Sequence, residues 1–130
     1  MEYFRTINVK TVEQHIQESL NLRNLGAMSN QIFIIGDQNE KEANIGSIWG
    51  EFTLSRSEIK GGLRFALLEC PNALSWTITT GFPPDEESII ILLTINRQEK
   101  NKEFVEEIEE FLDDQSACLK EFFTLNHKTV

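Results

Sequence analysis

A chain of 130 residues is long enough to bury the core of one domain, and its composition, 40% apolar and 25% charged, is that of a folded globular protein. The formal net charge of −9 disfavours nonspecific binding to nucleic acid and attraction to anionic membranes, because both need clustered cations. The charge instead favours a basic protein or a small cation as the partner.

The N-terminus, the apolar runs and the cysteines predict a cytoplasmic protein. Residues 1–10 lack a positively charged region followed by an apolar core, so we expect no secretory signal. The longest apolar run, residues 89–93, is far shorter than the roughly 20 residues that a membrane helix needs. Cys70 and Cys118 have no ligand-pair spacing, and we expect reduced thiols, with one disulfide as the alternative.

The beginning of the chain predicts a strand followed by a helix. Residues 3–9 alternate in a way that suits an edge strand. Thr11 is a good N-cap with Gln14 at the capping-box spacing, and Gly26 is a plausible stop. One stripe of this helix carries three apolar residues: Val12, Ile16 and Leu20.

Two strands are expected next. The short apolar run in residues 31–36 predicts the first, and the polar residues 36–44 predict an exposed connection after it. Residues 45–55 alternate as a single strand, which places Trp49 and Glu51 on the same face.

Three more strands follow, separated by turn residues. The glycines in residues 60–62 predict one turn, and Pro71 with Asn72 predicts another. A loop at residues 81–87 then leads into residues 88–96, which are apolar on both faces and therefore predict a central strand.

From residue 101 the period of the apolar residues changes from two to 3.6, which predicts a long C-terminal helix with one apolar and one acidic side. The order strand, helix, five strands, helix predicts one α+β domain over residues 1–130. We expect a mainly antiparallel sheet of about five or six strands, with the N-terminal and the long C-terminal helix on one face.

Little in the chain points to catalysis. His15 and His127 have no acidic or cysteine partner at ligand spacing, so we expect a solvated helix residue and a frayed terminus rather than a metal site. Cys118 lies on the apolar stripe, where burial raises the pKa of a thiol, and Cys70 is interpreted as a small buried residue rather than a nucleophile. We therefore expect no enzymatic activity, no metal and no cofactor.

The acidic side of the C-terminal helix is the first candidate binding surface. Like charges at helical spacing repel by about a few tenths of a kcal/mol per pair, so the cluster is tolerated rather than favoured for stability, and a function would explain that cost. The alternative is an ordinary solvated helix face. The candidate residues are Glu103, Glu106, Glu107, Glu110, Asp113 and Asp114.

The sheet face directed away from the helices is the second candidate surface. Trp49, Glu51 and Arg64 are expected there, and an exposed tryptophan and arginine among hydroxyl groups are typical of a protein-protein interface. The alternative is a half-solvated sheet in which Glu51 and Arg64 pair across strands. The other residues expected on this face are Thr53, Ala66, Leu68, Ser75, Thr77, Thr79, Ile90, Leu92 and Thr94.

Three functional hypotheses follow. The leading one is a small acidic protein-binding domain that engages a basic partner, in its most specific form an immunity-type protein that neutralises a toxin or nuclease, by analogy of charge and size. The second is a small-ligand or enzymatic domain with a pocket between sheet and helix that uses Glu51, Arg64 and Cys70. The third is a homodimer that buries Trp49 or the edge strand at residues 3–9.

Overall fold

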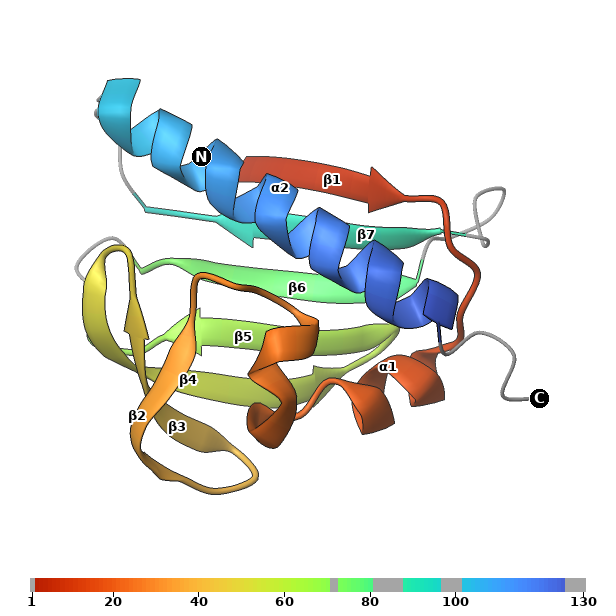
Figure 1. Ribbon diagram of the computed structural model, residues 1–130, viewed down its shortest axis with the longest axis horizontal. Helices are drawn as coiled ribbons and strands as arrows, with labels where there is room; N and C mark the ends of the chain where they lie inside the picture. The colour runs from red at the N-terminus through yellow and green to blue at the C-terminus, as the bar shows by residue number, and fades with distance from the viewer. Residues whose placement is uncertain (1, 71–72, 81–87, 97–101, 126–130) are drawn as a thin grey trace.

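The computed structural model describes residues 2–70, 73–80, 88–96 and 102–125. These residues form a seven-stranded antiparallel sheet in the order β1-β7-β6-β5-β4-β3-β2, with the helical segments on one face (Figure 1). Each strand from β2 to β6 pairs with the strand that follows it in the chain. Strand β1 pairs with β7 and forms one edge of the sheet. The α+β class and the long C-terminal helix agree with the sequence prediction, whereas the sheet has more strands than expected.

The elements have the following bounds. The strands are β1 (Glu2–Ile7), β2 (Phe33–Gln38), β3 (Glu42–Ser47), β4 (Gly50–Ile59), β5 (Gly62–Leu67), β6 (Ser75–Thr80) and β7 (Ile89–Thr94). The helical segments are the short helix α1 (Glu13–Ser19), the 3-10 segment η1 (Leu22–Ala27) and the 24-residue helix α2 (Lys102–Leu125).

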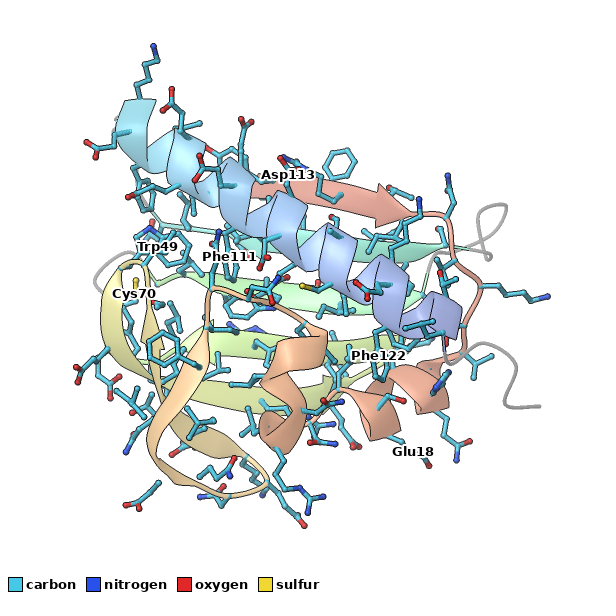
Figure 2. The ribbon with its side chains drawn as sticks, in the orientation of Figure 1. Glu18, Trp49, Cys70, Phe111, Asp113 and Phe122 are labelled. Atoms are coloured by element: carbon cyan, nitrogen blue, oxygen red, sulfur yellow. The ribbon has the colours of Figure 1, made fainter. Side chains whose placement is uncertain are left out.

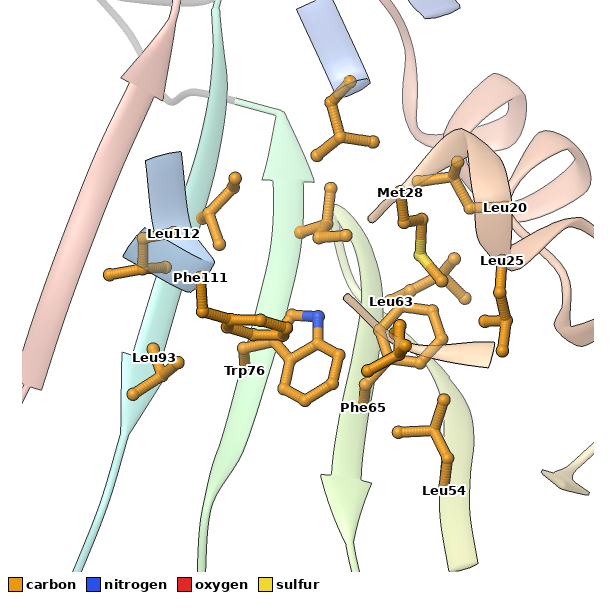
Figure 3. Close-up of a cluster of buried hydrophobic side chains, with 14 of the residues drawn as sticks. Leu20, Leu25, Met28, Leu54, Leu63, Phe65, Trp76, Leu93, Phe111 and Leu112 are labelled. Atoms are coloured by element: carbon orange, nitrogen blue, oxygen red, sulfur yellow. The ribbon is translucent and has the colours of Figure 1, made fainter. Parts of the chain in front are cut away.

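The core lies between the helical layer and the sheet face that this layer covers, which we call the inner face. Helix α2 crosses the inner face diagonally, with η1 and α1 beside it (Figure 1). Phe65 stacks on Trp76 with ring centroids 5.6 Å apart, and Phe111 of α2 meets Trp76 edge-on at 5.2 Å (Figure 3). Leu112 and Leu93 pack in the same cluster, so the apolar stripe of α2 is core, as its 3.6-residue period predicts.

The prediction of a single strand at residues 45–55 is wrong, because a hairpin turn interrupts this segment. Strand β3 ends at Ser47, Ile48 and Trp49 form the turn, and β4 begins at Gly50 with φ +117°. Glycine adopts this angle without a steric penalty. The Ser47 hydroxyl donates to the Gly50 carbonyl at 2.9 Å and accepts from the Trp49 amide at 3.2 Å, which stabilises the turn.

The polar connection expected at residues 36–44 is in part strand. Strand β2 continues to Gln38 and β3 begins at Glu42, with Asn39 making the turn between them. The Asn39 side-chain oxygen accepts from the amides of Lys41 and Glu42 at 2.8 and 3.0 Å. This local hydrogen bonding lets a polar segment form a hairpin without an apolar signal.

The single N-terminal helix expected from Thr11 to Gly26 is also wrong. The Thr11 hydroxyl contacts the His15 ring nitrogen Nδ1 at 3.2 Å instead of capping the backbone, and α1 ends at Ser19. The chain then forms η1, whose N-cap Asn21 accepts from the Arg23 amide at 3.0 Å. The Asn21 cap begins a separate segment and so divides what the apolar spacing suggests is one helix.

Arg56 of β4 stabilises the end of α1. Its guanidinium donates to the Leu20 carbonyl at 2.8 Å and also to the Gln17 carbonyl. A cation at a helix C-terminus satisfies carbonyl groups that have no partner within the helix and complements the helix dipole. A residue 36 positions after Leu20 therefore fixes where α1 ends.

Other predictions agree with the structure. Strand β1 is an edge strand, and β7 lies inside the sheet between β1 and β6. The turn at Lys60 and Gly61 joins β4 to β5, with Gly61 at φ +92°. The predicted turn at Pro71 and Asn72, the loop at residues 81–87 and the tail with His127 lie outside the described residues.

Candidate functional site

The acidic side of α2 faces away from the core (Figure 2). We call its N-terminal half the acidic ridge, and it comprises Glu103, Glu106, Glu107, Glu109 and Glu110. All five are exposed except Glu107, which is half-buried. Within the described part of the chain, no hydrogen-bond or ion-pair partner is found for the carboxylates of Glu106, Glu107, Glu109 or Glu110.

Asp113 and Asp114, the other two acidic candidates on α2, contact other parts of the fold. Asp113 Oδ1 forms an ion pair with Arg5 Nε of β1 at 3.0 Å. Asp114 accepts four hydrogen bonds: from Ser29 Oγ at 2.6 Å, from the backbone amide and Nδ2 of Asn30 at 2.9 and 3.1 Å, and from Cys118 Sγ at 3.8 Å. These contacts join α2 to β1 and to the segment between η1 and β2, so the six predicted carboxylates do not form one uniform surface.

Both cysteines are free thiols. Cys118 lies one turn after Asp114, with 3.8 Å between its Sγ and Asp114 Oδ1, and it accepts from Asn30 Nδ2 at 3.4 Å. Burial first, and then the negative charge of Asp114, raise the pKa of the Cys118 thiol. A raised pKa keeps the thiol protonated and a poor nucleophile, as its place on the apolar stripe predicts.

The expected place of Trp49 is wrong: it lies on the inner side of the sheet, not on the face away from the helices. Its ring centroid is 5.2 Å from that of Phe111 and 6.3 Å from that of Phe104, both on α2 (Figure 2). The prediction failed because it extended a two-residue alternation through a turn. Trp49 thus connects the β3–β4 hairpin to the helix that carries the acidic ridge.

Glu51 and Arg64 do lie on the sheet face that has no helix, which we call the outer face, and both are exposed. The expected pairing between them is wrong, however. Arg64 is opposite Ser57 on one side and Thr77 on the other, whereas Glu51 is opposite Gly46 and lies six residues along β4 from Ser57. Glu51 and Arg64 are therefore on neighbouring strands but are separated by most of the length of β4, measured along the strand direction.

Glu69, which the sequence reasoning overlooked, lies beside a shallow hollow of about 350 Å³ on this side of the molecule. Its carboxylate accepts from the Thr53 amide at 2.6 Å and from the Thr53 hydroxyl at 2.8 Å. These hydrogen bonds, the backbone one first, lower the pKa of the exposed Glu69 carboxyl. The bonds extend the β4–β5 pairing beyond Leu67, which assigns Glu69 a structural role.

The space between α2 and the inner face is filled by aromatic and aliphatic side chains (Figure 3). Glu51 and Arg64, which the small-ligand hypothesis places in a pocket there, lie on the other side of the sheet. Gln115 of α2 is fully buried in this layer, and neither of its amide atoms has a hydrogen-bond partner among the described residues. The ligand hypothesis therefore loses its two charged residues, whereas Cys70, the third residue that it named, is half-buried and packs against the core.

Neither the grouping of metal-ligand side chains, nor the hydropathy of the helices, nor similarity to known proteins assigns a function to this chain. In the described ranges, no three histidine, cysteine or acidic side chains are grouped to hold a metal ion. None of the helices described is both long and apolar enough to cross a membrane. No protein-family model matches the chain, and none of the curated proteins matches it in sequence.

Proposed function

We propose that this protein acts by binding a basic protein through the acidic ridge of α2, and that it is not an enzyme. The observation that carries the proposal is the set of carboxylates at Glu106, Glu107 and Glu110, which have no cationic partner among the described residues and project from a helix fixed to the core. Its most specific form is an immunity-type protein that neutralises a toxin or nuclease.

Charge repulsion within the ridge supports a role in binding. Two pairs in the ridge are four residues apart, and three pairs are three residues apart: Glu103 with Glu107 and Glu106 with Glu110, then Glu103 with Glu106, Glu106 with Glu109 and Glu107 with Glu110. Each like-charge pair costs about 0.2–0.5 kcal/mol, so the five pairs cost roughly 1–2.5 kcal/mol of folding free energy. A cationic partner would relieve this repulsion when it binds.

The rigidity of the ridge also supports the proposal. Phe104, Ile108 and Phe111 are buried on the opposite side of the same turns of α2, and Trp49 packs on two of them. A binding surface that is already ordered loses little conformational entropy on association. An ordered row of carboxylates also attracts a cationic protein over several ångströms and raises the association rate.

A pull-down tests the proposal, followed by association kinetics on the captured protein. The ridge variant carries Glu106→Gln, Glu107→Gln and Glu110→Gln. The control variant carries Asp37→Asn, Glu40→Gln and Glu42→Gln, which removes three exposed carboxylates from the β2–β3 hairpin and changes the net charge equally. Wild-type protein and both variants are immobilised, incubated with lysate of the source cells at low salt, and eluted by raising salt.

We expect a basic protein to elute from the wild type and the control variant but not from the ridge variant. With that protein purified, the ridge variant should reduce the association rate constant at low salt by about tenfold or more and flatten its salt dependence. The proposal is wrong if no basic protein is captured. It is also wrong if both variants lose the partner equally, because binding would then follow net charge alone.

A further inference from the structure

We propose that the outer face of the sheet is the interface of a symmetric homodimer. The residues concerned are those that point outward from β1, β7, β6 and β5, which we call the outer patch. The strand register gives three such positions on each strand: Glu2, Phe4 and Thr6; Ile90, Leu92 and Thr94; Ser75, Thr77 and Thr79; Gly62, Arg64 and Ala66.

The outer patch is unusual for this chain because it is nearly free of charge. The whole sequence has 21 acidic and 12 basic residues, yet the outer patch has only Glu2, at one corner, and Arg64. Its net charge is therefore zero in a chain whose net charge is −9. A sheet face that is always in water usually carries polar and charged side chains opposite the buried ones, whereas this one carries hydroxyl and aliphatic groups.

Apolar side chains form the part of the outer patch near the β1 edge. Phe4 is 64% exposed and lies directly opposite Leu92, which in turn lies opposite Thr77. Ile90 lies two residues before Leu92 on the same face, and both side chains are half-buried among their neighbours in the sheet. Within the described residues, α1, η1 and α2 are all on the inner side (Figure 1), so these side chains have no covering layer within the protomer.

A second copy of the chain is the occupant that this chemistry fits. At the outer patch a basic partner would meet only one carboxylate and an acidic partner only one arginine, whereas an identical patch is equally neutral and rich in hydroxyl and aliphatic groups. Two such faces can pack about 10 Å apart with aligned strands, as in a β-sandwich. A two-fold axis places the same patch on both sides of the contact.

The size of the face matches the requirement of a dimer. Seven strands spaced about 4.8 Å apart, with about six residues of roughly 3.4 Å each, give a face of roughly 700 Å². Specific interfaces bury about 600–1,000 Å² on each partner. The outer patch supplies the neutral part of this area, and β4, β3 and β2 supply the rest, which includes the exposed Phe33 and also the carboxylates of Glu42 and Glu51.

The dimer does not depend on the proposed function of the acidic ridge. Stacking through the outer faces leaves α2 of each protomer on the outside of the assembly, because α2 covers the opposite side of each sheet (Figure 1). Both ridges stay accessible. Failure of the dimer would therefore leave the ridge hypothesis intact, and failure of the ridge would leave the dimer intact.

Sedimentation equilibrium of the purified chain tests this inference. The face variants are Leu92→Lys, at the centre of the apolar region, and Phe4→Lys, at the edge strand. The control is Val12→Lys, which introduces the same charge at an apolar residue away from the sheet. The exposed fraction of Val12, 61%, is close to that of Phe4, 64%. Circular dichroism and thermal melting at low concentration show whether each variant is folded.

We expect the wild type and Val12→Lys to sediment at twice the chain mass. Leu92→Lys should raise the dissociation constant by about tenfold or more, and Phe4→Lys by less, because each dimer would bury two unpaired ammonium groups. The inference is wrong if the wild type stays monomeric up to about 1 mM, beyond which affinity has little meaning for a specific complex. It is also wrong if a folded Leu92→Lys variant dimerises as strongly as the wild type.

Discussion

At the scale of single residues, two neighbouring aspartates on α2 show how position decides the role of a carboxylate. Asp113 is 69% exposed in its side chain and forms one ion pair with Arg5. Asp114 is half-buried and accepts from Ser29, which is 1% exposed, and twice from Asn30. An exposed ion pair contributes little to stability, whereas hydrogen bonds from buried donors to a charged acceptor contribute more.

We therefore predict different losses of stability for the two aspartates. Asp114→Ala should lower the free energy of unfolding by about 2–3 kcal/mol, because it leaves the buried Ser29 hydroxyl without its acceptor. Asp113→Ala should lower it by less than about 1 kcal/mol. Urea denaturation of both variants measures the difference, and equal losses would contradict the assignment of Asp114 as the residue that joins α2 to the η1–β2 segment.

The hydrogen bonds of Glu69 predict that the stability of the fold depends on pH. Its pKa in the folded protein lies below its usual value of 4.5, because the ionised carboxylate accepts from the Thr53 amide and hydroxyl. A depressed folded-state pKa contributes stability above the unfolded-state pKa, and this contribution is lost as pH falls through the folded-state pKa. Glu69→Gln should thus be less stable than the wild type at neutral pH, and the difference should shrink as pH falls below 4.5.

Chemical denaturation of the wild type and Glu69→Gln across this pH range measures the effect. Glu51→Gln is the control, because Glu51 is also exposed and borders the same hollow, but no hydrogen bond from Thr53 reaches it. A constant difference between the wild type and Glu69→Gln from neutral to acidic pH would show that the ionised carboxylate does not stabilise the fold.

At the scale of elements, Trp49 couples the β3–β4 hairpin to the N-terminal half of α2. The contact with Phe104 and Phe111 holds the turns that carry the acidic ridge. The C-terminal half of α2 has a separate attachment, through the hydrogen bonds of Asp114 and the buried side chains of Leu119 and Phe123. The two halves of the helix are thus held by different parts of the sheet and loops.

Trp49→Ala is therefore expected to affect one half of α2 more than the other. It should lower the free energy of unfolding by about 2–3 kcal/mol, less than for a fully buried tryptophan because Trp49 is half-buried. Amide hydrogen exchange should accelerate in residues 103–111 more than in residues 119–125. Equal acceleration in both halves would contradict the separate attachments, and a change in oligomeric mass would contradict the place of Trp49 on the inner side.

At the scale of the whole molecule, the two sides of the sheet have opposite characters. The helical side carries the acidic ridge, and the other side carries the neutral outer patch. This separation allows one surface to attract a cationic protein while the other joins two protomers. A dimer would present two ridges, which strengthens binding to a partner with two basic surfaces through effective concentration.

Association through the outer patch predicts a melting temperature that depends on protein concentration. Because only folded chains dimerise, the melting temperature of the wild type should rise by several degrees over about a hundredfold increase in concentration. The same increase should have little effect on Leu92→Lys. Differential scanning calorimetry at two concentrations measures both, and a wild-type melting temperature that stays constant would contradict the dimer.

The residue spacing predicted those features that depend on neighbours along the chain. The 3.6-residue period identified the buried side of α2, and the continuous apolar run at residues 88–96 placed β7 inside the sheet. The period of two also places Thr77, Thr79, Ile90 and Leu92 on one face, as the register shows. These features follow from local geometry, so a sequence pattern carries them.

Tertiary contacts decided the features that residue spacing did not predict. The turn at Ile48 and Trp49 reversed the side of Trp49, because Gly50 and Ser47 stabilise a hairpin where the apolar pattern continues unbroken. The sequence alone therefore determined the α+β class, the long amphipathic helix and the acidity of its exposed side. Only the folded structure decided which carboxylates are engaged and that the helices described all lie opposite the neutral outer patch, because both depend on residues far apart in the chain that meet through packing and strand register.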